Sequence, residues 1–293
     1  MKVLQAIIMG LIQGLTEFLP VSSSGHLALI KAIFGLETDT GILFDVLLHV
    51  ATLISITVVF YKDVFRLVIE FFYMCADLFK NCVIFFKSIT NNGGDEMYEK
   101  IISNPYRKFD ILLILSTIPT GIIGIFMDDV VEYSSKNLLI TGICLLGTGV
   151  ILLISDFLPD KGKRIKEVNY GNALAVGFTQ GIATLPGLSR SGTTITACLL
   201  CGFDRKFAAK YSFIMSMPAI LGALVLELTK IGDESVGAGD VGCYFLGMII
   251  AGVIGFIALK ITMKLVVSKY FRYFAFYCFG VGVISIIVFL IKL

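Results

Sequence analysis

Six long apolar segments constrain the fold of this chain more than any other feature. A helix that crosses the hydrocarbon core of a bilayer needs about 20 mostly apolar residues. Segments of this kind lie at 41–61, 111–127, 138–155, 211–229, 241–259 and 273–291. The chain is 57% hydrophobic and only 16% charged, whereas soluble domains carry about a quarter charged residues. We therefore predict an all-α, polytopic membrane protein in which residues 1–293 form a single integral membrane domain.

Two further apolar segments, 3–34 and 173–202, are interrupted by polar turns. The first turn runs from Pro20 to His26 and the second from Pro186 to Gly192. Non-helical backbone at membrane depth is tolerated only where it is buried in protein or lines a water-filled cavity. We therefore expect each segment to form a re-entrant helix-turn-helix hairpin, in addition to the six spanning helices.

The two interrupted segments resemble each other. A shift of 167 residues aligns Gly10 with Gly177, Gln13 with Gln180, Gly14 with Gly181, Ser22 with Ser189, Ser24 with Ser191, and Gly25 with Gly192. Internal similarity of this kind indicates a repeat, with repeat A at about 1–110 and repeat B at about 170–293. Three predicted crossings separate the copies, so they run in opposite directions. Such inverted repeats place their broken helices together near the bilayer midplane.

The charges of the connecting loops predict the orientation. Lysine and arginine gather in the connections 62–108, 158–170, 203–210 and 260–272, whereas acidic residues dominate the turns 36–40, 128–136 and 230–240. Basic loops face the cytoplasm, so both termini face outward and the first hairpin opens from outside. The net charge is only +2 and the basic residues are scattered, which argues against a nucleic-acid partner.

One of these connections contains its own predicted helix. Charged residues recur at helical spacing along an otherwise apolar stretch, at Asp63, Arg66, Glu70, Asp77 and Lys80. A polar stripe of this kind is typical of an amphipathic helix on the membrane surface and argues against a seventh span.

Five ionisable residues fall within the apolar segments: Glu17, His26, Asp45, His49 and Arg190. Each costs about 2.5–3.5 kcal/mol at the centre of a membrane helix, even on a lenient scale. They could pair with one another and simply lock the helices together. Alternatively, they form a ligand site, and the residues around them indicate which ligand.

Hydroxyl groups and a guanidinium lie where two half-helices are predicted to begin. Ser22–Ser24 precede one half-helix, and Ser189 and Ser191 flank the start of the other. Half-helix N-termini carry partial positive charge and free N–H groups that suit an anion. Arg190 presents a planar fork of donors that matches phosphate. These residues together predict phosphate binding.

The remaining ionisable groups suggest chemistry on that phosphate. Glu17 could hold a divalent cation on an anionic substrate or act as a base. His26 could transfer a proton or attack phosphorus directly, and Ser23 is the competing nucleophile. A phosphate ester within the membrane accounts for all of these groups together.

Two motifs carry a resemblance to a known family. Residues 13–26 (QGLTEFLPVSSSGH) and 186–192 (PGLSRSG) resemble the two signatures of the undecaprenyl pyrophosphate phosphatase family, which is linked to bacitracin resistance. The resemblance implies hydrolysis of undecaprenyl diphosphate to undecaprenyl phosphate and phosphate, which recycles the carrier lipid for peptidoglycan and other wall polymers. It also implies a magnesium or calcium requirement, and an active site open to the outer face of a bacterial plasma membrane.

The family's acidic motif is E/Q-x-x-x-E, and here its first position is Gln13, so only Glu17 is acidic. We therefore expect Glu17 to bind the metal, with Asp45 as a hypothetical source of the missing carboxylate oxygen. His49 and Thr194 are secondary candidates for the site. The nucleophile stays open between His26, Ser23 and water. The oligomeric state also stays open, with a homodimer as one arrangement.

A different function class shares part of this pattern. Inverted repeats, broken helices and charges at the midplane are also typical of secondary transporters, and a lipid flippase is a related alternative. The serine, histidine and arginine residues distinguish the two, because a carrier needs binding groups but no nucleophile. We predict that Arg190→Ala and His26→Ala each abolish phosphate release.

Overall fold

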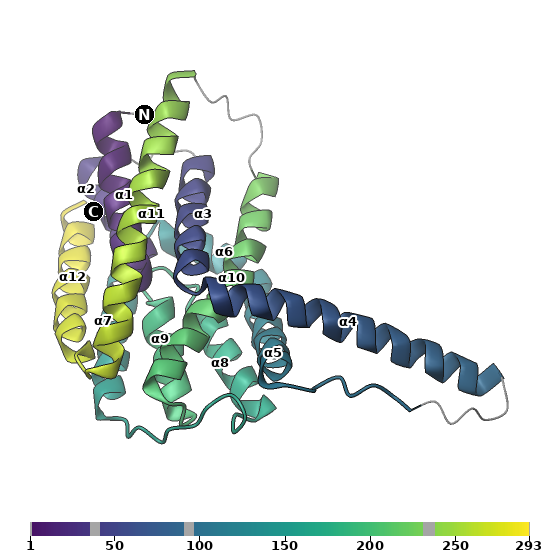
Figure 1. The fold of residues 1–293 in the computed structure, drawn as a ribbon. Helices are drawn as coiled ribbons and strands as arrows, with labels where there is room; N and C mark the ends of the chain where they lie inside the picture. The colour runs from purple at the N-terminus through teal and green to yellow at the C-terminus, as the bar shows by residue number, and fades with distance from the viewer. Residues whose placement is uncertain (1, 36–41, 91–96, 231–237, 293) are drawn as a thin grey trace.

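The structure, a computed structural model, describes residues 2–35, 42–90, 97–230 and 238–292. Within these residues all named elements are helices (Figure 1). They are α1 (Val3–Phe18), α2 (Ser23–Phe34), α3 (Ile42–Val59), α4 (Tyr61–Thr90), α5 (Pro105–Phe126), α6 (Asp128–Ser135), α7 (Leu138–Phe157), α8 (Tyr170–Ile182), α9 (Arg190–Leu200), α10 (Arg205–Lys230), α11 (Ala238–Val267) and α12 (Phe271–Lys292). The acidic turn expected at 36–40, and most of the one at 230–240, lie outside the described residues.

The long helices confirm an all-α, polytopic membrane protein. Five of them, α5, α7, α10, α11 and α12, are long and apolar enough to cross a membrane. A sixth crossing is obtained if α3 and α4 count as one span, although the two helices are bent by 91° where they meet. The α3 half corresponds to the segment expected at 41–61.

Each interrupted segment forms two helices joined by a short turn. In the first, α1 ends at Phe18 and α2 begins at Ser23; in the second, α8 ends at Ile182 and α9 begins at Arg190. The residue before each second helix is a serine, which is a favoured N-cap because its hydroxyl can accept a backbone N–H. Ser22 accepts from the Gly25 N–H at 3.3 Å, and Ser189 accepts from the Gly192 N–H at 3.2 Å. That the hairpins are re-entrant, and that they belong to two repeats, stays a prediction.

Glycines bring the first helix of each hairpin into close contact with a helix distant in sequence. Helix α1 packs along α11, and α8 packs along α5. A Cβ on Gly10 would lie 2.6 Å from the carbonyl oxygen of Gly247, and one on Gly177 would lie 2.1 Å from that of Ser116. Small residues allow this approach between membrane helices. Both hairpins are therefore fixed against long helices.

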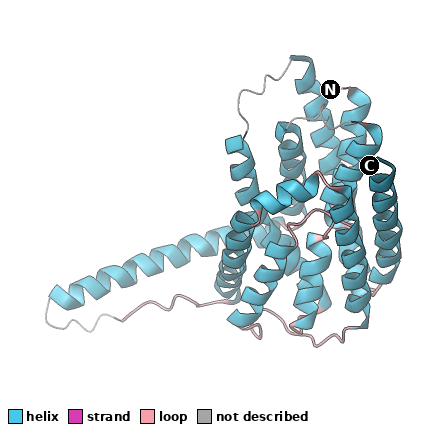
Figure 2. Cartoon of the chain, turned by 180° about the vertical axis from the view of Figure 1, so that it is seen from behind, coloured by secondary structure: helices cyan, strands magenta, loops and turns pink. Residues whose placement is uncertain are grey.

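Helix α4 projects sideways from the bundle in both views (Figures 1 and 2). The acidic residues of its predicted stripe bind the neighbouring helices. Lys210 on α10 lies 2.8 Å from Asp63, and Arg107 on α5 lies 3.1 Å from Glu70 and 2.6 Å from Asp77. These ion pairs tie α4 to α5 and α10.

An aromatic cluster holds α10 against α5 and against the connection that precedes α10. Phe109, Phe203, Phe207 and Tyr211 pack with ring centroids 5.4–5.9 Å apart. The buried Tyr211 hydroxyl also donates to the Leu112 carbonyl at 2.9 Å. This fixes the rotation of α10, and with it the residues that α10 presents to the two hairpins.

Candidate active site

The turns of the two hairpins touch each other. The Ser22 hydroxyl accepts the Gly187 N–H at 3.1 Å, in addition to the N–H of its own helix. Ser22 has a φ of 71° and Gly187 a φ of 95°. A Cβ on Gly187 would also lie 2.3 Å from the Thr141 carbonyl oxygen, so only glycine fits there. The contact brings residues of the two motifs into one cluster.

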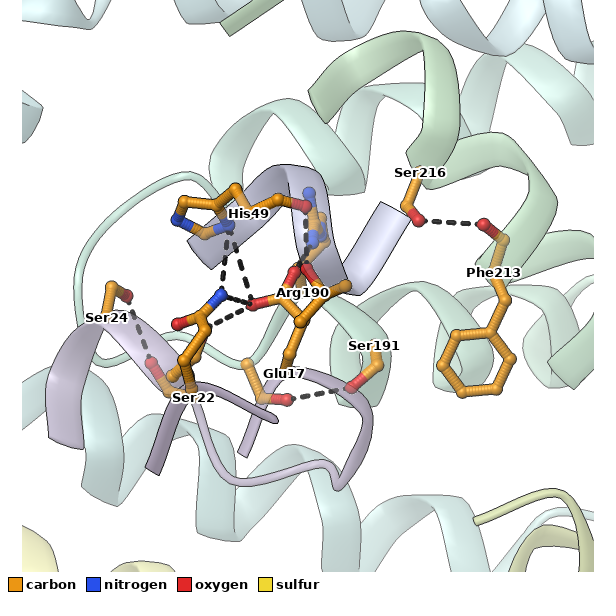
Figure 3. A network of polar contacts seen from close by, with 12 residues as sticks. Glu17, Ser22, Ser24, His49, Arg190, Ser191, Phe213 and Ser216 are labelled. Carbon is orange, nitrogen blue, oxygen red and sulfur yellow. Dashed lines mark hydrogen bonds and ion pairs between the residues drawn. The ribbon is translucent and has the colours of Figure 1, made fainter. Parts of the chain in front are cut away.

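Glu17, at the end of α1, is the centre of that cluster (Figure 3). Its carboxylate is buried and binds residues from both hairpins. Arg190 donates to Oε1, while Ser23 donates to Oε2 at 2.6 Å and Gln13 donates to Oε2 at 3.1 Å. The structure therefore unites four of the predicted site residues in one hydrogen-bonded network.

Helix α3 contributes His49 to the same network. Its Nδ1 lies 3.1 Å from Gln13 Nε2 and 3.9 Å from Glu17 Oε2. Asp45, one turn earlier on α3, instead forms an ion pair with Lys31 at 2.5 Å. Lys31 binds Oδ2 of Asp45, whereas Oδ1 is buried without a hydrogen-bond partner among the described residues. That Asp45 supplies a second metal-binding oxygen stays a hypothesis.

A small pocket of about 10 Å³ lies beside the Glu17–Arg190 pair. A pocket of that size has room for about one water molecule at most. The pocket is lined by Glu17, Phe18, Arg190, Ser191, Ser212, Phe213 and Ser216. Sequence reasoning did not identify Ser212 and Ser216, which α10 presents beside the site. The internal repeat could have identified both serines, because a shift of 167 residues places Asp45 on Ser212 and His49 on Ser216.

The remaining predicted serines and Thr194 organise the starts of α2 and α9. Ser22 and Ser24 hydroxyls lie 3.3 Å apart, and those of Ser189 and Ser191 lie 3.4 Å apart. Thr194 donates to the Arg190 carbonyl at 2.8 Å and contacts the Ser212 hydroxyl at 2.5 Å. Thr194 thus links the helix that carries Arg190 to α10.

His26 lies on a different side of the first turn. Its Nδ1 is 2.7 Å from the Ser22 carbonyl oxygen, and its Nε2 is 2.8 Å from the Tyr277 hydroxyl on α12. Both ring nitrogens therefore have partners. Within the described residues, no hydrogen bond or ion pair joins His26 to Glu17 or Arg190, and His26 does not line their pocket. Tyr277 is a second residue that sequence reasoning did not identify.

Metal binding at this cluster would depend on its oxygen donors. The described residues contain no group of three or more histidine, cysteine or acidic side chains that could hold a metal ion. However, Gln13 Oε1 is buried without a hydrogen-bond partner there, next to the Glu17 carboxylate. Magnesium is often held by one or two carboxylates together with substrate phosphates. The oxygen donors of Gln13 and Glu17 fit that mode of binding.

Comparison with known proteins gives one consistent result. Residues 6–284 match the family described as Bacitracin resistance protein BacA. A protein of Alkaliphilus metalliredigens is 40% identical over 292 residues, covering 98% of both chains. Proteins of Methanosphaera stadtmanae and Halothermothrix orenii are 37% and 39% identical, again over 98% of each chain. All three are named undecaprenyl-diphosphatase.

Proposed function

Because the chain belongs to the bacitracin resistance protein BacA family, we propose that it is a membrane phosphatase that dephosphorylates undecaprenyl diphosphate. The products are undecaprenyl phosphate and inorganic phosphate, and the reaction underlies bacitracin resistance. One observation carries the proposal for the site. The Glu17 carboxylate binds a guanidinium and a serine hydroxyl that stand at the first turns of two different half-helices.

The terminal phosphate would bind between the starts of α2 and α9. Two helix N-termini and the Arg190 fork provide positive charge and N–H donors there. The pocket of about 10 Å³ is too small for a diphosphate. The substrate must therefore open the Glu17–Arg190 pair, after which Arg190 binds phosphate oxygens. Glu17 is then released from the Arg190 guanidinium, while its contact with the Ser23 hydroxyl remains.

Ser23 is our choice for the nucleophile. Its hydroxyl already donates to Glu17 at 2.6 Å, within the reach expected of a general base. Ser23 attacks the terminal phosphorus, its proton passes to Glu17, and the bond to the bridging oxygen breaks to release undecaprenyl phosphate. A water molecule then hydrolyses the phosphoserine and releases phosphate. His26 is less suited to this role because both of its ring nitrogens are hydrogen-bonded elsewhere.

A divalent cation is part of the proposal. Glu17, together with the side-chain amide oxygen Oε1 of Gln13, would hold magnesium or calcium beside the substrate phosphates. A bound cation neutralises charge on the transferring phosphoryl group, which is the main demand of this chemistry. A chelator series on the purified protein tests this part, with restoration by added magnesium or calcium as the expected result.

We also propose that the pocket faces the outer side of a bacterial plasma membrane. The basic connections 158–170 and 260–272 lie at one end of the bundle (Figure 1), and basic loops face the cytoplasm. In this orientation the prenyl tail enters from the outer leaflet, between membrane helices. Labelling of a single cysteine by a membrane-impermeant reagent in intact cells tests the assignment.

The decisive experiment measures phosphate release from undecaprenyl diphosphate by purified protein in detergent. We expect release by the native chain and little or none by Glu17→Gln, which keeps the shape of the side chain. Absence of release by the native chain, combined with movement of labelled lipid across proteoliposomes, would contradict the proposal and support a flippase.

A further inference from the structure

A second candidate ligand site lies away from the catalytic cluster, at the corner between α4 and α5. There a groove of about 390 Å³ runs along one face of α5. Most of its lining is apolar, and it contains one carboxyl group. The lining residues are Phe71, Asp110, Leu113, Ile114, Thr117, Ile118, Gly121 and Pro218.

The carboxyl of Asp110 is the feature that points to a ligand. Asp110 is only 6% exposed, and its Oδ2 has no hydrogen-bond partner among the described residues. Arg107, one turn earlier on α5, is already bound by Glu70, Asp77 and the Ile101 carbonyl. Buried polar atoms are nearly always hydrogen-bonded, so Asp110 lacks a donor that an occupant of the groove would supply.

The position of α4 indicates that the groove opens toward lipid. The polar side of α4 is covered by the segment that returns to α5, where Asn81 pairs with the backbone of Glu99 at 2.8 and 2.7 Å. Elsewhere α4 exposes an aromatic residue every seven positions, with exposed fractions of 66–70%: Phe65, Phe72, Phe79 and Phe86. A helix with one polar and one aromatic side lies in the membrane interface. Acyl chains therefore reach the groove.

The substrate of the catalytic cluster is a poor occupant for this groove. Pro218 lines the groove and Ser216 lines the catalytic pocket. The two residues are two positions apart on α10, which places them on opposite faces of a helix with 3.6 residues per turn. The oxygens of a diphosphate are also acceptors, so they offer Asp110 Oδ2 no donor. The carboxyl instead suits a headgroup with a positively charged hydrogen-bond donor.

We propose that this groove binds one phospholipid of the bilayer whose headgroup carries a primary ammonium. An acyl chain lies along α5, and the ammonium donates to the Asp110 carboxyl group, which lines the groove. The lipid thereby covers the corner at which α4 joins the bundle.

The test uses fluorescence, because the chain contains no tryptophan. A Phe71→Trp variant places the only tryptophan in the groove. The protein is reconstituted in phosphatidylcholine with rising fractions of lipid that carries bromine, a quencher, on its acyl chains. We expect brominated phosphatidylethanolamine to reach half-maximal quenching at a mole fraction at least threefold lower than brominated phosphatidylcholine, whose headgroup has no N–H donor. Adding Asp110→Leu removes this difference.

Phe79→Trp is the matched control, because Phe79 is exposed on α4 away from the groove. We expect both brominated lipids to quench it equally. Phosphate release by the Asp110→Leu variant shows that it is folded. Equal quenching of Phe71→Trp by the two lipids overturns the proposal, as does the absence of quenching at both positions. If added prenyl diphosphate relieves the quenching of Phe71→Trp, the substrate is the occupant of the groove. If a higher protein-to-lipid ratio relieves it, a second copy of the chain is the occupant. Either result overturns the proposal.

Discussion

The two hairpin turns use the same backbone device to present different chemical groups. In each, a serine caps the second helix and a second serine follows two residues later, at Ser22 and Ser24 or at Ser189 and Ser191. The residue between them is Ser23 in the first turn and Arg190 in the second. Equivalent positions therefore supply a hydroxyl on one side of Glu17 and a guanidinium on the other.

This difference shows how a repeated scaffold becomes an asymmetric site. The caps and glycines define two similar helix starts, whereas the residue between the serines defines the role of each turn. Glu17 has no acidic counterpart, since a shift of 167 residues places it on Thr184. One carboxylate thus serves both turns. The first turn is expected to provide the reacting atom and the second to provide the charge that binds phosphate.

The largest effect should come from the reacting atom of the first turn. We expect Ser23→Ala to lower phosphate release about 10⁴-fold, because removal of a nucleophile eliminates the covalent route. Release is measured on purified protein, and rapid quenching followed by mass spectrometry tests the native chain for phosphoserine. Ser24→Ala is the matched control and should retain activity within about tenfold. Near-normal release by Ser23→Ala would exclude Ser23 and leave His26 or water as the nucleophile.

The charge of the second turn should matter almost as much. We expect Arg190→Ala to lower phosphate release about 10³-fold, since an arginine that stabilises a transferring phosphoryl group contributes about that much. Arg190→Lys should recover only part of the loss, because an ammonium lacks the two-pronged donor geometry. Arg272→Ala, which removes a partly exposed ion pair with Asp156, is the control. Equal activity of the alanine and native proteins would remove Arg190 from the mechanism.

His26 gives a sharper test of how the turns differ, because its counterpart is Thr193. The sequence predicts that His26→Ala abolishes release. The contacts of His26 with Ser22 and Tyr277 predict a smaller loss, of about 10- to 100-fold, through displacement of the first turn. Steady-state kinetics distinguish the two. Tyr277→Phe should reproduce part of the smaller loss, because it removes one of the two contacts that hold the His26 ring.

The smallest effects should come from the shared caps. We expect Ser189→Ala to lower the free energy of unfolding by about 1 kcal/mol. Ser22→Ala should lower the free energy of unfolding by about 1 kcal/mol more than Ser189→Ala does, because the Ser22 hydroxyl also accepts the Gly187 N–H from the other turn. Thermal unfolding in detergent measures both. Equal losses would show that the contact between the turns contributes little.

The sequence predicts these turns well because their determinants are local. Proline, glycine and serine interrupt two apolar segments, and the structure breaks its helices at those points. The pairing of Glu17 with Arg190 follows from the cost of isolated charges in a membrane. Ser212, Ser216 and Tyr277 were missed because each reaches the turns from a long helix whose rotation depends on distant packing. The pairing of Asp45 with Lys31 likewise depends on the angle between α2 and α3.

The ion pair between Glu17 and Arg190 also affects how the two phosphorylated lipids compete. Any anion that enters must displace a carboxylate from the guanidinium before it gains that cation. A diphosphate carries more negative charge than the monophosphate left after cleavage, so it competes better for Arg190. After cleavage, Glu17 pairs with Arg190 again, which favours departure of the undecaprenyl monophosphate. An internal carboxylate that competes with every ligand would thus limit product inhibition and keep the enzyme turning over while monophosphate accumulates around it.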